Sequence, residues 1–329
     1  GISDGGEIAS GTDPLDAADP SPAAFLVSYW PLDETDGVTT PDLGPHGYDL
    51  VLNAMSGANF VDFDGRRAAL FDGVAAILTR IHAPGDELPI VRHDGFTVSL
   101  WVNILGAGQN DRRIFSEGST SNADPLYNLG TKNDGADNTL DLFLRDVGTP
   151  GHQFSFGTPL DGFWHHIVVT HNALDGRVRT FIDGVLDRED WTFKALVSPA
   201  FNTTSVGGIL RAAPSHWVNG HIDDVALWKI ILTPDAIADL AAGTSPLDLA
   251  GPPFRITDIL RDAGTGDVTL TWNSKPGRTY VVRFSHDLLG DPRNWADLTD
   301  SFTATGNSSS YTDNGAAGTP VRFYVIEEL

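Results

Sequence analysis

Histidines are the side chains of this sequence best suited to metal or acid–base chemistry, and three of its 10 histidines fall in one predicted strand. His165 and His171 share a face of the segment FWHHIVVTHN, but six residues separate them. At the rise of a β-strand this spacing is about 20 Å, so the two imidazoles cannot bind one metal ion. His166 points to the opposite face. The sequence also lacks the His-Glu-x-x-His and Gly-x-Ser-x-Gly motifs, and we predict no catalytic residue.

Two tryptophans are candidates for sugar binding, which needs exposed aromatic rings beside polar groups. Trp191 (DREDWTFK) and Trp217 (APSHWVNG) lie near predicted loops, and we predict them as ligand-binding residues. The alternative is that both cover a sheet edge or pack under a loop. Trp101, Trp228 and Trp272 fall in strand patterns, which predicts that they are core residues.

The composition excludes several classes of function. With 44 Asp and Glu against 21 Lys and Arg, the formal charge is −23, so nucleic acid and anionic membranes are not expected partners. No apolar run approaches the roughly 18 residues of a membrane span, which predicts no membrane insertion. Cysteine is absent, which excludes thiol chemistry, disulfides and cysteine-bound zinc. Because the chain begins at Gly1 rather than Met, we expect a processed product.

The pattern of residues is typical of an all-β protein. The acidic residues are 37 Asp and only 7 Glu, and Asp-Gly, a strong hairpin signal, occurs nine times. Short strands recur between these turns, and residues 177–182 alternate strictly, with Val178, Thr180 and Ile182 on one face. So many strands without helices predict a two-layer sandwich. One helix is predicted after Thr233, which can cap it, and it ends at Gly243.

We divide the chain into four parts. Residues 1–24 carry acidic but no basic groups and few large apolar side chains, which indicates an N-terminal arm or linker. Residues 25–245 form the predicted large sandwich, residues 246–253 are a predicted linker, and residues 254–329 form a second, smaller β-sandwich.

Several segments, taken in this order, resemble a known family. They are YWPLDETDG, PDLGPHGYDL, ALFDG, FTVSLWVNI, FWHHIVVTHNALDGRVRTFIDGVL and GHIDDVALWKIILTPDAI. Residues 25–245 are thus similar to the laminin-G-like, concanavalin A-type antiparallel jelly-roll domains of bacterial secreted proteins. The tail, with VTLTWNSKPGRTYVVRFSHDL and RFYVIE, resembles immunoglobulin-like fibronectin-III modules.

The laminin-G-like resemblance implies one structural Ca²⁺ ion. The positions that match its ligands are Asp42 in PDLGPHG and Asp223 in GHIDDV, with the backbone carbonyls of Gly44 and His46. Such a set suits calcium, which takes six to eight oxygen ligands. The alternative is that Asp42 closes an Asx turn and Asp223 pairs with an arginine.

The same resemblance bears on function. Glucanases of this fold use a Glu-x-Asp-x-Glu strand, which the sequence lacks, so we predict that the protein is not an enzyme. We favour a calcium-stabilised, lectin-like protein, secreted or at the cell surface, that binds a glycan or protein in adhesion. A second hypothesis is a subunit of an extracellular filament or surface assembly, with residues 1–24 docked on another copy. A glycosidase or lyase that uses distant Asp residues is a third.

Overall fold

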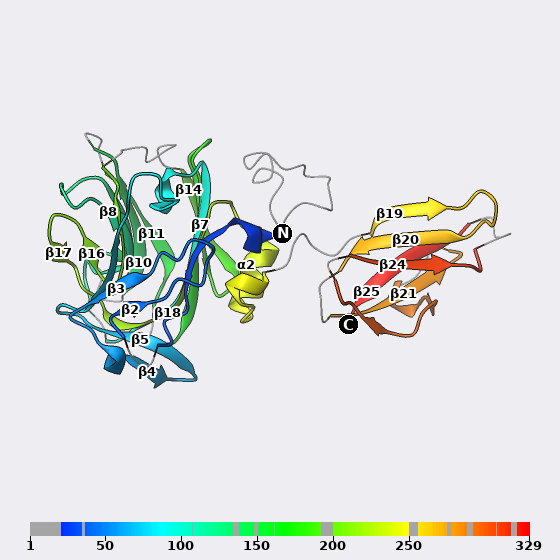
Figure 1. The fold of residues 1–329 in the computed structure, drawn as a ribbon, viewed down its shortest axis with the longest axis horizontal. Helices are drawn as coiled ribbons and strands as arrows, with labels where there is room; N and C mark the ends of the chain where they lie inside the picture. The colour runs from blue at the N-terminus through cyan, green and yellow to red at the C-terminus, as the bar shows by residue number, and fades with distance from the viewer. Residues whose placement is uncertain are drawn as a thin grey trace. The chain divides into compact units, whose positions relative to one another are not determined.

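The computed structural model describes residues 21–34, 37–106, 108–133, 138–147, 151–160, 162–191, 200–249, 256–274, 278–287, 292–306, 308–316 and 321–329. The chain divides into two compact units, with the boundary in the sequence after Leu249, and each is described by itself (Figure 1). Both are built from antiparallel sheets, so the predicted all-β sandwich fold is confirmed. No helix among these residues is long and apolar enough to cross a membrane.

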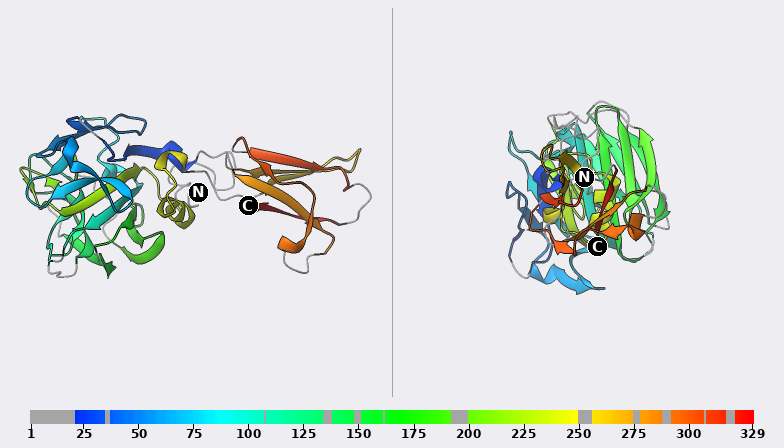
Figure 2. Two further views of the ribbon diagram at one scale, coloured as in Figure 1. Left: turned by 90° about the horizontal axis from the view of Figure 1, so that it is seen from below. Right: turned by 90° about the vertical axis from the view of Figure 1, so that its right-hand side faces the viewer.

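The first unit contains two large sheets that lie face to face (Figures 1 and 2). The strand order of the first sheet is β14 (Val185–Trp191), β13 (Arg177–Ile182), β12 (His165–Asn172), β7 (Gly95–Ile104), β18 (Asn219–Trp228), β5 (Arg66–Asp72) and β4 (Phe60–Phe63), and β1 (Leu26–Trp30) also pairs with β18. The order of the second sheet is β11 (His152–Pro159), β10 (Thr139–Arg145), β9 (Leu126–Thr131), β8 (Arg113–Gly118), β15 (Thr203–Val206), β6 (Ile77–Ile81), β3 (Leu50–Asn53) and β2 (Thr39–Thr40).

Shorter elements complete this unit. They are the hairpin β16 (Ile209–Leu210) and β17 (Pro214–Ser215), the helix α2 (Pro234–Ala241), and the 3-10 turns η1 (Pro22–Phe25), η2 (Gly57–Asn59), η3 (Ile90–Arg92) and η4 (Pro246–Asp248). Of the predicted arm 1–24, residues 1–20 lie outside the described part. The predicted linker 246–253 begins with residues packed on the first unit, since Pro246 and Leu249 are buried.

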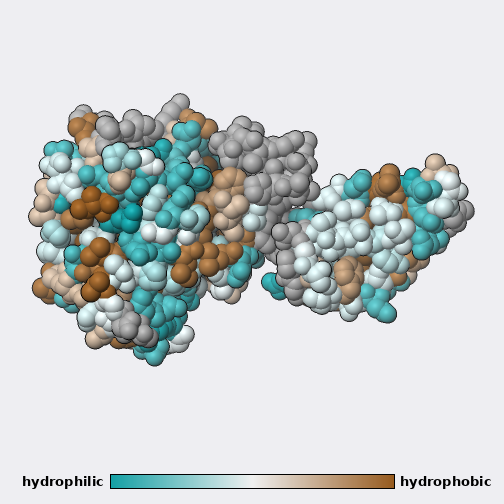
Figure 3. All heavy atoms as spheres, in the orientation of Figure 1, coloured by the Kyte–Doolittle hydropathy of each residue, from teal (hydrophilic) through white to brown (hydrophobic). Residues whose placement is uncertain are grey.

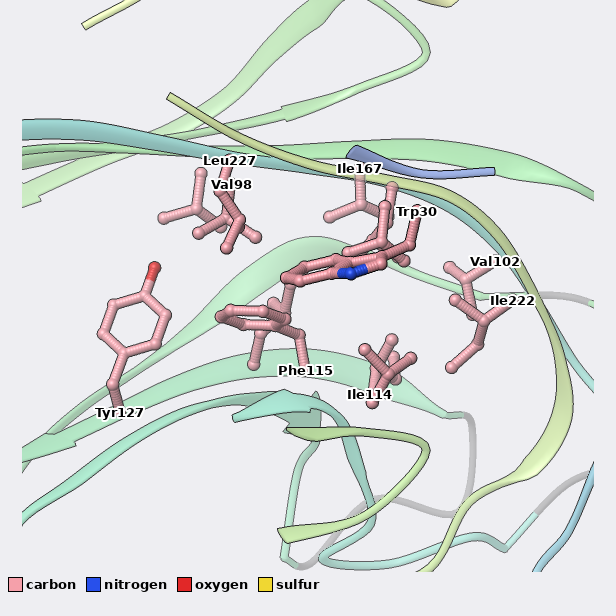
Figure 4. Close-up of a cluster of buried hydrophobic side chains, with 14 of the residues drawn as sticks. Trp30, Val98, Val102, Ile114, Phe115, Tyr127, Ile167, Ile222 and Leu227 are labelled. Carbon is pink, nitrogen blue, oxygen red and sulfur yellow. The ribbon is translucent and has the colours of Figure 1, made fainter. Parts of the chain in front are cut away.

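The main core fills the space between the two sheets (Figure 4). Alternation along the strands explains it: on β7, Phe96, Val98, Leu100, Val102 and Ile104 all point inward and are at most 1% exposed. Trp30 is fully buried in the same core, and its indole N–H donates to the carbonyl of Tyr48 at 2.9 Å. The alternate residues of the same strands point away from this core, onto the outer face of the sheet.

A second apolar cluster lies on the outer face of the first sheet, beneath α2. Thr233 caps the helix as predicted, and its hydroxyl accepts the N–H of Ala236. Ile237 and Leu240 of the helix pack on Phe181 and Trp228 of the sheet, together with Tyr29 and other residues. Trp228 is therefore buried as predicted, although in this outer cluster. The helix covers one part of the outer face, and outward residues elsewhere on it, such as Asn103 and His221, are also buried.

Two of the Asp-Gly pairs have the backbone expected of a hairpin turn, whereas Asp175–Gly176 has a positive φ only at Gly176 and Asp94–Gly95 at neither residue. Asp64 and Gly65, between β4 and β5, have φ angles of +47° and +82°, and Asp183 and Gly184, between β13 and β14, have +51° and +80°. A type I′ turn requires positive φ at both central residues, which Asp tolerates and Gly prefers. These turns fix the register of the strands that carry the outer face.

The second unit is a smaller pair of antiparallel sheets. One sheet has the order β19 (Ile256–Arg261), β20 (Val268–Asn273) and β24 (Ser308–Asp313), and the other has β22 (Ala296–Asp297), β21 (Thr279–Ser285) and β23 (Phe302–Thr303), with β25 (Phe323–Glu328) paired to β21 and the turn η5 (Pro292–Asn294) before β22. Trp272 is fully buried among Leu270, Tyr280 and Val282, so its predicted core position is confirmed. The resemblance of this unit to fibronectin-III modules stays a prediction.

The two sheets pack closely at Gly207, which follows β15 and faces Phe71 on β5 of the opposite sheet. Its φ is +82°, and a Cβ atom there would lie 2.0 Å from Cδ1 of the buried Phe71. Gly65 has the same φ of +82°, but a Cβ there would meet nothing within 4 Å. We expect Gly65→Ala to lower the free energy of unfolding by about 1–2 kcal/mol, from backbone strain alone. We expect Gly207→Ala to cost at least about 2 kcal/mol more, from overpacking. Urea unfolding measures both, and equal losses would contradict the packing described.

Candidate ligand-binding site

The predicted calcium loop is held together by the carboxylate of Asp42. Its Oδ1 atom accepts the N–H groups of Tyr29 at 2.7 Å and Gly44 at 2.8 Å, and its Oδ2 atom accepts the N–H of Tyr48 at 2.8 Å. Gly44 lies so close that a Cβ would be 2.9 Å from Oδ1 of Asp42. The ring of His46 stacks on Tyr48, with 5.1 Å between centroids. The loop thus has the Asx-turn arrangement of the alternative interpretation.

Asp223 belongs to a different cluster, centred on Arg66. The Nε atom of Arg66 donates to Oδ2 of Asp223 at 2.7 Å, and its second terminal nitrogen donates to Oδ2 of Asp224 at 2.5 Å. The hydroxyl of Tyr29 donates to the other oxygen of Asp224 at 2.5 Å. Asp223 therefore pairs with an arginine, the second feature of the alternative interpretation.

The candidate oxygen ligands therefore do not fit a calcium ion in this arrangement. Both oxygens of Asp42 accept backbone N–H groups, and Oδ2 of Asp223 faces a guanidinium, whereas Ca²⁺ needs free oxygens. Among the described residues no three carboxylate or imidazole groups lie close enough to hold a metal ion. Calcium at Asp42, Gly44, His46 and Asp223 stays a prediction, and no further step is built on it.

A bulge in β18 explains how two consecutive aspartates reach one arginine. Neighbouring residues of a regular strand point to opposite faces, so Asp223 and Asp224 would normally diverge. The pairing of β18 with β7 shifts register between Asp223 and Ala226, and Asp224 has a φ of +50°. Such a bulge re-aims side chains and is common next to functional sites.

This cluster forms one wall of a pocket of about 290 Å³ on the outer face of the first sheet. The pocket lies next to the end of α2, where the apolar cluster under the helix gives way to polar residues. Its lining comprises Tyr29, Arg66, Ser99, Trp101, His166, Asp224, Leu240, Gly243, Thr244, Ser245 and Pro246. The volume is near the lower end of the range for small-molecule sites.

Trp101 supplies the aromatic surface of this pocket. The sequence pattern predicts it as a core residue, and this prediction is wrong: Trp101 alternates with the inward residues of β7 and is half-buried on the outer face. The guanidinium carbon of Arg66 lies 4.2 Å from the centroid of its ring, a cation–π distance. The same carbon lies 5.7 Å from the ring of Trp164, which extends the aromatic surface beyond the pocket.

Ser99 and His166 form a hydrogen-bonded pair at the inner end of the pocket. The hydroxyl of Ser99 lies 2.8 Å from Nε2 of His166, and burial lowers the pKa of His166 to about 4. The imidazole is therefore neutral at pH 7. Its Nδ1 atom is buried and has no hydrogen-bond partner among the described residues. A buried polar atom without a partner is costly unless a ligand or water satisfies it.

The carboxyl groups here are not arranged for hydrolysis. Burial, followed by repulsion from Asp224, raises the pKa of Asp223 well above its usual value. A raised pKa alone would suit a general acid, but glycoside hydrolysis needs two carboxyl groups on opposite sides of the bond. Asp223 and Asp224 lie on one wall and share Arg66, and Asp223 does not line the pocket.

The two predicted sugar-binding tryptophans lie elsewhere and apart from each other. Trp191 ends the edge strand β14, is 53% exposed, and has the guanidinium carbon of Arg177 5.8 Å from its ring. Trp217 follows β17, is half-buried, and pairs in parallel with Arg113 of the second sheet. No described contact joins either of them to the pocket, and their role in binding stays a prediction.

Comparisons with known proteins agree with this fold. A family model described as the concanavalin A-like lectin/glucanases superfamily matches residues 80–238, which include the whole of β7, β12 and β18. This part of the first unit is thus similar to that superfamily, in agreement with the resemblance seen in the sequence. Among curated proteins, none matches the chain in sequence.

Solved structures are similar to the chain at low identity. The receptor binding domain of botulinum neurotoxin C/D mosaic serotype has a TM-score of 0.52 at 11% identity, over 80% of this chain and 74% of that one. The binding domain of Paraclostridial Mosquitocidal Protein 1 has 0.50 at 12%, over 77% and 64%. Domain 4 of an extracellular arabinanase from Geobacillus stearothermophilus, in complex with arabinotriose, has 0.45 at 19%, over 66% and 98%. At these identities the similarity concerns the fold alone.

Asp42 gives a direct test of the loop. We expect Asp42→Ala to lower the free energy of unfolding by roughly 2–4 kcal/mol, because three backbone N–H groups lose their acceptor. The loss should be the same in EDTA and in millimolar CaCl₂, measured by thermal unfolding. Asp62→Ala, at a side chain that is 87% exposed, is the matched control and should change little. A calcium-dependent rise in stability that Asp42→Ala abolishes would instead establish the calcium site.

Proposed function

We propose that the first unit is a non-catalytic, lectin-like module that recognises a glycan in the pocket around Trp101 and Arg66. The observation that carries the proposal is the pocket itself: an aromatic ring, a carboxylate, a guanidinium and hydroxyl groups converge on a small space. Sugars have both C–H faces, which stack on aromatic rings, and hydroxyl groups, which bind polar side chains. The match to a lectin and glucanase superfamily supports the same class of ligand.

One face of the first unit is mixed in polarity. On the face drawn in Figure 3, apolar residues form several separate groups among polar ones. This face therefore lacks the large continuous apolar patch that would mark a protein or membrane interaction site. The wider proposal is therefore a protein that is secreted or held at a cell surface and takes part in adhesion through glycans. The match to a lectin superfamily and the resemblance to domains of secreted proteins support it.

The pocket is tested by removing its aromatic ring. We expect the full chain to bind at least one glycan on a broad array, and Trp101→Ala to weaken that binding by about tenfold or more. Trp101→Phe, which keeps an aromatic ring, should retain much of the binding, and thermal unfolding should show that both variants are folded. Trp191→Ala is the control and should bind as the wild type does. Binding lost in Trp191→Ala or Trp217→Ala but kept in Trp101→Ala would contradict the proposed site.

A second candidate function, a subunit of an extracellular filament or surface assembly, depends on residues 1–24. Most of them lie outside the described residues, so the candidate is supported only by the acidic, turn-rich composition of this segment. If the segment joins copies of the chain, its deletion will convert an assembly into monomers in analytical ultracentrifugation. If the protein instead acts only in glycan binding, deletion of residues 1–24 should leave both the oligomeric state and the glycan binding unchanged.

A further inference from the structure

We propose that the ligand of this pocket is a neutral sugar, and that the carboxyl groups around Arg66 exclude sugars that carry a carboxylate or sulfate. The inference rests on the proposed glycan-binding function and adds the chemical class of the ligand. The inference is drawn from the charged groups around the pocket and from the ion pairs that these groups already make.

The positive charge of the pocket is already paired with carboxyl groups of the protein. Arg66 is the one arginine or lysine among the residues that line the pocket, and both Asp223 and Asp224 accept hydrogen bonds from it. The pKa of Asp33 is raised, first by burial and then by repulsion from the carboxylate of Asp224. Two carboxyl groups thus bind one guanidinium directly, and the charge of Asp33 acts on the same cluster. An acidic ligand would have to compete with them for Arg66 and would meet repulsion from Asp224.

Neighbouring basic groups do not add to the charge of the pocket. The guanidinium of Arg67 donates to the carbonyls of Asp33, Glu34 and Phe60 and lies 3.5 Å from the carboxylate of Asp62. His166 is neutral at pH 7 because burial lowers its pKa. The carboxylate of Asp183 accepts the backbone N–H of His166 at 2.9 Å and adds a further negative charge nearby.

The remaining polar groups suit hydroxyl groups. Each oxygen of Asp224 already accepts one hydrogen bond, from Tyr29 or from Arg66, and keeps a second lone pair for a ligand hydroxyl. Thr244 and Ser245 belong to the lining at the end of α2. Nδ1 of His166 has no partner among the described residues, but this atom is enclosed by the protein and His166 is only 2% exposed, so it is not counted among the groups that meet a ligand. A neutral sugar therefore meets the accessible polar groups of the lining without bringing an opposing charge.

The overall charge of −23 would also repel acidic ligands, so the local effect needs a matched control. Asp224→Asn and Asp62→Asn each remove one negative charge from the whole protein. Asp224 lies in the pocket and Asp62 is on the exposed β4–β5 hairpin. Asp223→Asn changes the other partner of Arg66, which lies behind the lining, and is a second variant in case Asp224→Asn disturbs the bulge.

The experiment uses the full chain and an array that prints each neutral glycan beside its sialylated, uronic-acid and sulfated forms. We expect the wild type to bind neutral glycans and to bind their acidic forms at least about tenfold more weakly. Asp224→Asn or Asp223→Asn should narrow this ratio several-fold by freeing Arg66, whereas Asp62→Asn should leave it unchanged.

The outcomes separate the two proposals. Equal or tighter binding of the acidic forms by the wild type would overturn the inference and leave the glycan-binding function standing, and so would an equal effect of Asp62→Asn. If no glycan of either kind binds, or if Trp101→Ala binds as the wild type does, the proposed function itself fails, and the inference fails with it.

Discussion

The first unit depends on one constraint: each strand has two faces, and the inner one must be buried against the opposite sheet. On β7 this commits Phe96, Val98, Leu100, Val102 and Ile104 to the core. Each inward residue leaves an outward neighbour, because the side chains of a strand alternate. Chemistry on this sheet is therefore confined to the outer residues that neither α2 nor the neighbouring loops cover.

The bulge in β18 is the local departure from this alternation that creates the site. It turns two consecutive aspartates toward Arg66, which in turn lies over Trp101. Arg66 and Asp224 are only partly buried, and such an ion cluster is weak evidence for a contribution to stability. Here the cluster fixes the position of Arg66 and gives one wall of the pocket its balance of charge.

Much of the fold could be predicted from the sequence, because strand alternation and turn chemistry are local signals. The Asp-Gly turns, the cap at Thr233 and the buried Trp228 and Trp272 all follow from short patterns. The prediction for Trp101 is wrong for a physical reason. The strand pattern shows that side chains alternate between two faces but not which face is covered, and a large apolar ring such as that of Trp101 suggests the core. The adjacent aspartates in GHIDDV were the available signal for the bulge, but the sequence does not show that Arg66, far earlier in the chain, is their partner.

The central claim is that a glycan binds on the outer face of the first sheet, beside α2. Titration of the isotope-labelled full chain with a glycan chosen from the array, followed through the indole N–H signals of its tryptophans by NMR, tests this most directly. The account predicts a large shift for Trp101, a smaller one for Trp164, and none for Trp191 or Trp217. Shifts at Trp191 or Trp217 with an unchanged Trp101 would contradict it.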